Sequence, residues 1–428
     1  MCNSEYLSAK TVPKLQNGNI VSNSISYFMK FAIIRERKTP PDRRVVLTPE
    51  ACAHLSKIFP EMEISVESSP IRTFTDQEYR DKGIQVTEDI SDAEVMLGVK
   101  EVPIDALIEG KKYFFFSHTI KEQPYNRDLL RAVLAKNIEL YDHEVITDQK
   151  EIRLVAFGRY AGIVGAYNGI RAFGLKTNSF DLSKAETLHD QNHLIEELKK
   201  VELPNIKIVL TGKGRVSNGA KEMLDAMGVR EVGFEAYLSE EFSEAVYTQI
   251  DVLEYNKRKD GRVIDMYDFF DHPEEYEGDF LRFAHVSDVY ITGHFYATGA
   301  PYLFTREDAK SKGFKIKVVA DISCDIDGPV ASTLKASSIA DPIYGYDPKT
   351  ETAVDYRNAE AIAVMAVDNL PNELPRDASK GFSENFVTRV IPAFFNQDQD
   401  GILERARMTK NGKLTPRYAY LQDYVDGV

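Results

Sequence analysis

The sequence predicts an α/β protein with two Rossmann-like domains, each built on a parallel sheet, and a cleft between them. From residue 31 onward, short β-rich runs alternate with amphipathic stretches, as in FAII, PEACAHLSKIF and ISVE. A second alternation starts at residue 205, where a strand-like run leads into a glycine turn and a helical stretch. Strands and helices that alternate in this way form parallel sheets covered on both faces. A length of 428 residues also favours two or three domains.

The first domain is expected to comprise residues 29–163 and, because the chain ends in further helical stretches, residues 371–428. Residues 1–28 lack the apolar region and cleavage site of a secretory signal, so we expect a disordered extension or a start of translation at Met29. The run RYAGIVGAYNGIRAFG at 159–174 has small residues at helical spacing and should form a closely packed helix between the domains.

The second domain is expected to span residues 164–370 and to bind a dinucleotide. After the strand and glycine turn at 205–224, REVGF at 230–234 is the expected second strand. DVYIT and KIKVVADIS provide later strands, and RNAEAIAVMAVDNL at 357–370 has a helical pattern. The charged segment 238–285 should be an insertion that carries its own short helices.

Composition excludes several classes of protein. The 53 basic and 67 acidic side chains give a net charge of −14, which would repel a phosphate backbone, so nucleic acid is not an expected partner. No apolar run reaches the roughly 18 residues of a membrane span. Cys2, Cys52 and Cys324 are too scattered for a disulfide framework or a zinc site, so we expect no metal and a reducing, cytoplasmic location.

The glycine turn is the first candidate site. Gly212, Gly214 and Gly219 directly follow a strand and open a helix, where backbone N–H groups can approach the pyrophosphate of NAD or NADP. Ser217 occupies the place of the third glycine in the G-x-G-x-x-G pattern, and an ordinary βα turn explains the same residues. Glu235 is the best candidate for the acid that binds the ribose, although this assignment does not separate NAD from NADP.

Lys100 and His118 form the second candidate site. Each ends a predicted strand, in LGVK and FFFSH, and the carboxyl ends of parallel strands border the ligand crevice. Burial and nearby cations lower a lysine pKa, and histidine titrates near neutrality, so the pair suits acid–base chemistry. The alternative is a pair of solvated strand ends.

Further charged residues adjoin apolar runs. Arg44 and Arg153 could each hold a carboxylate through a bidentate contact, although most such arginines are surface residues. Asp321 and Asp325 end a very apolar strand and should face the crevice, where they could hold a substrate ammonium group.

Together these segments resemble lysine-forming saccharopine dehydrogenase, and most closely the lysine–ketoglutarate reductase half of aminoadipic semialdehyde synthase. The resemblance covers about residues 31 to 422 and depends on the order and spacing of several segments. These are RERKTPPDRRVVLTP, LGVKEVP, FFFSHTIKEQ, RLVAFGRYAGIVG, VLTGKGRVSNGA, VVADISCDID, VDNLPNELPRDAS and NGKLTPRYAYLQ. The family is related to alanine dehydrogenase and to the nucleotide-binding subunit of transhydrogenase.

The resemblance implies an enzyme that uses NAD or NADPH to join L-lysine and 2-oxoglutarate into saccharopine, or that runs the reverse reaction. It assigns Lys100 as proton acceptor and His118 as proton donor. The implied substrate contacts are Arg44, Lys121, Glu144, Arg153, Phe157, Ser323, Cys324 and Asp325. The implied nucleotide contacts are Gly214, Arg215, Tyr296, Ile322, Val367, Asp368, Asn369 and Leu370.

Two alternatives remain at this stage. An amino-acid dehydrogenase of the alanine dehydrogenase kind would use Arg44, Lys100 and His118 in the same way. A non-catalytic nucleotide sensor is suggested by Ser217, although such a protein needs no acid–base pair.

Fungal members of the family carry a cysteine pair where Val216 and His294 stand here, so that disulfide cannot form. The sequence leaves homo-oligomerisation and reaction direction open.

Overall fold

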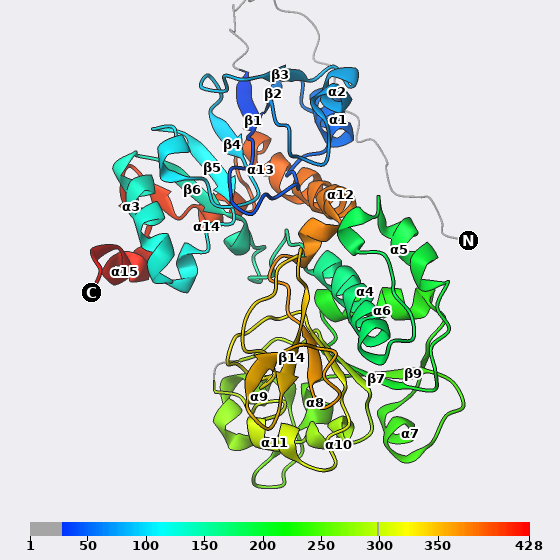
Figure 1. The fold of residues 1–428 in the computed structure, drawn as a ribbon. Helices are drawn as coiled ribbons and strands as arrows, with labels where there is room; N and C mark the ends of the chain where they lie inside the picture. Colours follow the sequence, from blue (N-terminus) through cyan, green and yellow to red (C-terminus); the bar gives the residue numbers. More distant parts are fainter. Residues whose placement is uncertain (1–27, 298) are drawn as a thin grey trace, which may run out of the picture.

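The computed structural model describes residues 28–297 and 299–428, and it contains two α/β units (Figure 1). The predicted extension, apart from Phe28, lies outside the described residues. In the described part of the chain, no helix combines the length and apolar character that crossing a bilayer requires. The predicted α/β fold class is confirmed.

The first unit is built on a six-stranded sheet in the order β3-β2-β1-β4-β5-β6, with every pair parallel. This order places β4 beside β5 and makes their carboxyl ends adjacent. The strands are β1 (Met29–Ile33), β2 (Met62–Glu67), β3 (Gln85–Thr87), β4 (Val95–Leu97), β5 (Lys112–Phe115) and β6 (Glu139–Asp142). The helices are α1 (Pro49–Ile58), α2 (Asp76–Asp81) and α3 (Arg127–Ala135).

Sequence signals at the helix starts explain two of these boundaries. Thr48 caps α1 by accepting a hydrogen bond from Ala51 N, and Pro49 occupies the first turn, where its missing N–H costs nothing. Thr75 and Glu78 form a capping box at the start of α2. Each cap satisfies backbone N–H groups that have no partner within the helix.

The C-terminal part of the chain returns to the first sheet. Phe394 contacts Phe31 of β1 with ring centroids 5.1 Å apart, and Phe395 stacks on Phe59 at 4.5 Å. These aromatic contacts place the last helices over the sheet, and Figure 1 shows α12 at the junction of the two units. The elements are α12 (Pro375–Asn385), a π-helical turn (Phe386–Val390), α13 (Ile391–Phe395), α14 (Ile402–Ala406), β17 (Thr409–Lys410), β18 (Lys413–Leu414) and α15 (Gln422–Asp426).

The second unit has an eight-stranded sheet in the order β15-β14-β16-β13-β12-β7-β9-β8. The six strands from β16 to β8 are parallel, and β14 and β15 extend the sheet in antiparallel pairings. The strands are β7 (Lys207–Thr211), β8 (Arg230–Glu231), β9 (Val246–Ile250), β12 (Val289–Thr292), β13 (Val318–Asp321), β14 (Ile343–Asp347), β15 (Thr352–Val354) and β16 (Ile362–Met365). The helices are α4 (Gly158–Thr177), α5 (Gln191–Leu198), α6 (Arg215–Ala226), α7 (Phe234–Ser239), α8 (Val252–Tyr255), α9 (Met266–Asp271), α10 (Leu281–Ala284) and α11 (Arg306–Lys310).

Three local predictions in this unit need correction. The expected second strand at 230–234 is reduced to β8 at the sheet edge, and the strand beside β7 is β9. Because β9 lies within 238–285, that segment is only partly an insertion. Its inserted part is the antiparallel hairpin of β10 (Asn256–Arg258) and β11 (Tyr276–Gly278) with α9 between them. The helical pattern predicted at 357–370 is wrong, because this segment contains the fully buried strand β16.

Helix α4 joins the two units by packing against α6 at very short range. A Cβ added to Gly162 would lie 1.8 Å from Val216 O, and one added to Gly219 would lie 2.0 Å from Arg159 O. Only glycine permits this approach of the two backbones. One continuous core consequently runs from Phe31 in the first sheet through α4 to Ile208 in the second.

We expect Gly162→Ala to destabilise the fold by about 1–3 kcal/mol or more, because the added methyl group forces α4 away from α6. Gly158→Ala is the matched control, since the nearest atom to its Cβ would be a methyl group of Val216 at 3.3 Å rather than backbone. Urea unfolding of both variants measures the difference. Equal midpoints would show that the close approach does not limit stability.

Candidate functional site

Lys100 and His118 follow neighbouring strands, and the sheet order brings them to one edge. The backbone N–H groups of Val99 and Lys100 donate to the Glu36 carboxyl group, with N–O distances of 2.6 and 2.9 Å, which fixes the chain where it leaves β4. Among the described residues, no side chain accepts a hydrogen bond from the Lys100 ammonium group. Burial lowers the pKa of Lys100, and the positive charges of Arg44 and Lys38 lower it further. Lys100 therefore has the properties of a base.

A carboxylate holds His118 in place. His118 Nδ1 lies 2.6 Å from Glu101 Oε1, and Lys38 Nζ donates to the other oxygen at 2.9 Å. Burial opposes ionisation of Glu101, but the hydrogen bonds from His118 and Lys38 hold its pKa at about 2. An ionised carboxylate only accepts hydrogen bonds, so Nδ1 of the ring carries a proton and Nε2 is left to exchange one. His118 also has the left-handed backbone conformation (φ 54°), which is uncommon outside glycine and occurs often at functional sites.

Arg44 is buried, and most of its guanidinium group is already engaged. Its Nε and Nη2 atoms donate to Asp42 at 3.0 and 2.6 Å, and Nη2 also donates to Asn369 Oδ1 at 2.8 Å. The guanidinium lies 4.3 Å from the centroid of Phe157. Among the described residues no acceptor binds Nη1, so this atom, rather than the whole planar fork, is available to a substrate carboxylate. The predicted bidentate contact needs this correction.

Arg153 approaches the same group of aromatic rings. It lies 5.2 Å from the centroid of Phe116, whose ring is 5.9 Å from that of Phe157. Glu144 lies between two cations, with oxygen–nitrogen distances of 3.9 Å to Arg153 and 3.7 Å to Lys121. These distances leave the ion pairs loose enough for a charged substrate to replace one partner.

The second unit contributes Asp325, Ser323 and Cys324 from the turn after β13. Asp325 is exposed, and its pKa is raised by partial burial and by Asp321, while the charge of Lys121 in the first unit opposes the rise. Asp325 of the second unit and Lys121 of the first therefore form a pair of opposite charges across the junction. Cys324 is half-buried, and its thiol donates to Ala366 O.

Asp321 does not face a crevice as the sequence predicted. It is fully buried, and its carboxylate accepts hydrogen bonds from the hydroxyl groups of Thr292, Ser323 and Thr333 at 2.6–2.9 Å. A carboxylate with these partners stabilises the turn after β13 and has no role in holding a substrate ammonium group.

Two hydrogen bonds join the predicted nucleotide residues to the predicted substrate residues. Arg215 donates to Arg153 O at 2.6 Å, and Asn369 accepts from Arg44. Asn369 belongs to the segment Val367–Leu370 after β16, in which Val367 and Leu370 are buried and Asp368 is exposed. The carboxyl edges of both sheets thus meet at one junction.

The glycine turn has the geometry that a pyrophosphate requires. Gly212 has φ +90°, and Gly214 caps α6 with open space where a side chain would be. Ser217 packs against Gly293 at the end of β12, where a Cβ would lie 2.8 Å from that of Ser217. Gly293, directly after β12, therefore permits the close contact between α6 and this strand that a third glycine on α6 would otherwise allow. Gly219 faces α4 and supports the fold.

Glu235 is exposed on α7, beyond the edge strand β8, and β9 separates it from the glycine turn. Asp251 directly follows β9, the neighbour of β7, and Gly212 N donates to Ile250 O at 2.6 Å. We infer that Asp251, rather than Glu235, takes the ribose-binding role. The spacing rule missed Asp251 because it assumes that the next strand in sequence is the next strand in the sheet.

The remaining predicted nucleotide contacts also lie at strand ends. Tyr296, in the loop after β12, is half-buried and donates to Ala300 O at 2.8 Å. Ile322, after β13, packs against Gly165 of α4. His294 is buried beside the glycine turn, with Nδ1 2.8 Å from Thr211 Oγ1. The nucleotide roles of Tyr296 and Ile322 stay predictions.

Comparisons with known proteins agree with this arrangement. Residues 32–164 match the model of the alanine dehydrogenase/PNT N-terminal domain. The mitochondrial alpha-aminoadipic semialdehyde synthase of Mus musculus is 27% identical over 94% of this chain and 48% of its own length. The saccharopine dehydrogenase [NAD(+), L-lysine-forming] of Yarrowia lipolytica is 25% identical over 84% of this chain and 90% of its own. The chain thus spans about half the length of the matching mouse protein.

Solved structures show the same fold. An L-alanine dehydrogenase superposes with a TM-score of 0.63 and 18% identity, covering 93% of this chain and 99% of its own. A transhydrogenase from Sinorhizobium meliloti gives a TM-score of 0.56 and 15% identity, covering 90% and 100%. The resemblance predicted from the sequence is confirmed as a similarity to these proteins.

We expect Asp251→Ser to weaken NADH binding by about tenfold, or about 1.4 kcal/mol, because the variant loses a carboxylate that accepts from ribose hydroxyls. Serine also caps helices well, so the cap that Asp251 provides to α8 is retained. Glu235→Ser is the control and should bind as the unmodified protein does. Fluorescence titration with NADH measures both affinities. If only Glu235→Ser weakens NADH binding, Glu235 rather than Asp251 binds the ribose.

Proposed function

We propose that this protein is a saccharopine dehydrogenase of the lysine-forming type, which reversibly joins L-lysine and 2-oxoglutarate by reductive amination. The observation that carries the proposal is the pair formed by Lys100, with its lowered pKa, and His118, which Glu101 holds in place. Both stand where the carboxyl edges of the two sheets meet. A reaction with two proton transfers next to a nucleotide requires this combination.

The charges around the pair favour a large substrate with several carboxylates. Arg44, Arg153 and Lys121 supply three cations, and Glu144 and Asp325 supply anions for an ammonium group. Pyruvate carries one carboxylate and no amine, so an alanine dehydrogenase needs fewer of these groups. Saccharopine carries three carboxylates and amino groups, which matches the mixture of charges.

Each residue has a chemical task in this proposal. The lysine ε-amine has a pKa near 10.4 in water, so a base must free it before it attacks the ketone of 2-oxoglutarate. Lys100 accepts that proton, and His118 donates one to the hydroxyl group that leaves as water. A nicotinamide nucleotide, when bound, supplies the hydride that reduces the resulting C=N bond. Arg44 and Arg153 hold the carboxylates and thereby keep the reacting atoms together.

We further propose NAD rather than NADP as the cofactor. A carboxylate at the end of the strand beside the glycine turn accepts from the ribose 2′-hydroxyl and repels a 2′-phosphate. Asp251 occupies this position, and the ammonium group of Lys213 in the glycine turn lies 3.6 Å from the carboxylate of Glu254. The names of the mouse and cattle relatives include a mitochondrial location, so the cytoplasmic location stays a prediction.

We expect NADH oxidation to require L-lysine and 2-oxoglutarate together. A spectrophotometric assay at 340 nm should show no turnover when either compound is omitted or when pyruvate and ammonia replace them. Rapid turnover with pyruvate and ammonia, and none with lysine, would instead identify an alanine dehydrogenase. Measurable NADH affinity without turnover on any of these substrates would identify a nucleotide sensor.

We expect Lys100→Met to lower kcat by roughly 10²- to 10⁴-fold and to remove one limb of the pH–rate profile, because the variant lacks the proton acceptor. Lys57→Met, at an exposed position of α1, is the matched control and should leave both unchanged. NADH titration confirms that each variant still binds nucleotide. A Lys100→Met protein that keeps kcat within a few-fold would show that Lys100 is a solvated strand end.

A further inference from the structure

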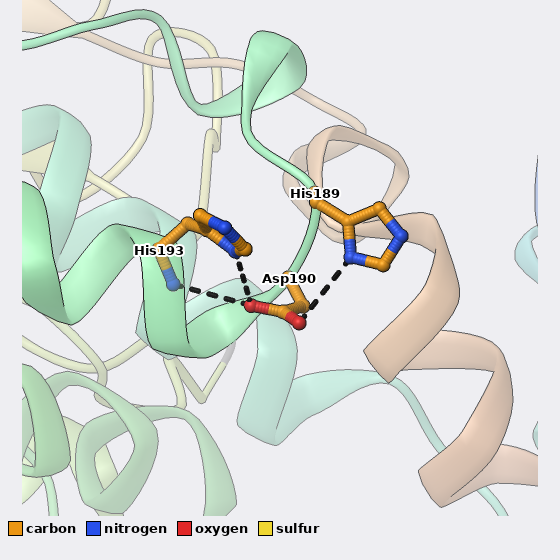
Figure 2. Close-up of side chains that lie close together, drawn as sticks. All are labelled: His189, Asp190 and His193. Atoms are coloured by element: carbon orange, nitrogen blue, oxygen red, sulfur yellow. Dashed lines mark hydrogen bonds and ion pairs between the residues drawn. The ribbon is translucent and has the colours of Figure 1, made fainter.

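Three potential metal ligands lie together at the start of α5. Asp190 caps this helix, His193 is its third residue, and His189 immediately precedes the cap. His193 Nδ1 lies 2.8 Å from Asp190 Oδ1, and His189 Nδ1 lies 3.3 Å from Asp190 Oδ2 (Figure 2). The three ligand atoms all lie within 4.8 Å of one another.

We propose that His189, Asp190 and His193 bind one divalent transition-metal ion of the Zn²⁺ class. Two imidazole nitrogens and a carboxylate oxygen form a donor set that suits zinc, with water completing the coordination. Bonds of about 2.0–2.2 Å in a tetrahedral site place neighbouring donor atoms about 3.3–3.6 Å apart. The two imidazole–carboxylate separations, 2.8 and 3.3 Å, lie near this spacing, and all three ligand atoms lie within 4.8 Å of one another, so small side-chain movements suffice to accept an ion.

Helix capping alone does not explain the cluster. Asp190 accepts from His193 N at 3.1 Å, which is an ordinary N-cap bond, and the His193 ring extends that contact. His189 lies outside the helix and is not needed for the cap, yet its Nδ1 atom also faces Asp190 (Figure 2). The imidazole nitrogens of His189 and His193 therefore both lie beside the Asp190 carboxylate, where one ion could contact all three side chains.

Two carboxylates, Asp190 and Asp377, lie at the start of α5, and Arg376 and Lys380 line the same cavity. Asp377 on α12 accepts from Gln191 N at 3.0 Å, which places a second carboxylate beside the first turn of α5. Within the described ranges Asp377 forms no ion pair, although the charges of Lys380 and Arg159 act on it, and Asp190 pairs with the two histidines. The helix N-terminus opposes a cation with about half a positive charge, which two carboxylates outweigh.

The position of the cluster suggests what the ion does. His189 and Asp190 line a cavity of about 570 Å³ together with His54 of α1 and Glu384 of α12. Helix α5 belongs to the second unit, whereas α1 and α12 cover the first, and Figure 1 shows α5 beside α12. A bound ion would fix the turn that begins α5, where Gln191 N donates to Asp377 of α12, on elements that carry neither Lys100 nor His118. Its role in this proposal is structural, and it does not depend on the proposed reaction.

Isothermal titration of the full-length, chelator-treated protein with ZnCl₂ tests the site. The protein must carry no histidine tag. We expect one ion per chain and at least tenfold weaker binding in His193→Gln and in Asp190→Asn. Asparagine is as good an N-cap as aspartate, so Asp190→Asn removes the charge and keeps the helix start. His272→Gln is the matched control, because His272 is exposed and lies 3.9 Å from the carboxylate of Glu274.

Two measurements complete the test. Zn²⁺ should raise the Tm of the unmodified protein and of His272→Gln, and should leave that of His193→Gln unchanged, because only an ion that binds the folded state stabilises it. MgCl₂ should produce no such shift, since Mg²⁺ prefers oxygen ligands. The proposal fails if no zinc binds, if His272→Gln weakens binding as much as His193→Gln, or if all variants bind zinc equally.

Discussion

The packing of α4 against α6 determines where the two halves of the site meet. Gly162 and Gly219 allow the backbones of the two helices to touch, which fixes α4 on the second sheet. The N-terminus of α4 directly follows the segment that contains Arg153 and Phe157. Helix α6 begins at the glycine turn, so the same contact sets the distance between the residues predicted to bind the nucleotide and those predicted to bind the substrate. The hydrogen bond from Arg215 to Arg153 O is one result.

Buried acids lie beside the cations at this junction, in a chain of net charge −14. Asp42 neutralises Arg44, and Arg44 holds the pKa of Asp42 well below its usual range despite burial. Burial raises the pKa of Glu36 to about 8, and the nearby charge of Asp42 adds to the effect, while two backbone N–H groups act in the opposite direction. Truncating one partner of such a pair would leave an uncompensated buried charge, which is more costly than losing an exposed ion pair.

Sequence reasoning succeeds where a site depends on strand order within one βα repeat. Lys100 and His118 are predicted to be neighbours because consecutive strands of a parallel sheet usually pair, and β4 and β5 do pair. The same assumption fails for Glu235, because the short strand β8 lies at the sheet edge and β9 takes the place beside β7. Burial of Asp321 is also unpredictable, since its partners Thr292 and Thr333 lie on the neighbouring strand and in a later loop, outside the local pattern of residues around Asp321.

The cluster at His189 shows a different limit of sequence reasoning. The spacing H-D-x-x-H contains the donors, but nothing in it indicates that a residue preceding a helix will turn its ring toward the cap. Asp377 lies nearly two hundred positions after Asp190 in the sequence. Only the return of the C-terminal helices brings Asp377 to α5.

The bond between Arg44 and Asn369 links the two ligands of the proposed reaction. Asn369 lies between Val367 and Leu370, in the segment predicted to contact the nucleotide, and its amide both accepts from Arg44 and donates to Asp42. A shift of this segment changes the acceptors of the guanidinium group and so changes which of its N–H groups face a substrate carboxylate. Residues that follow the second sheet therefore help to set the charge geometry beside the first, and the proposed site draws on both units.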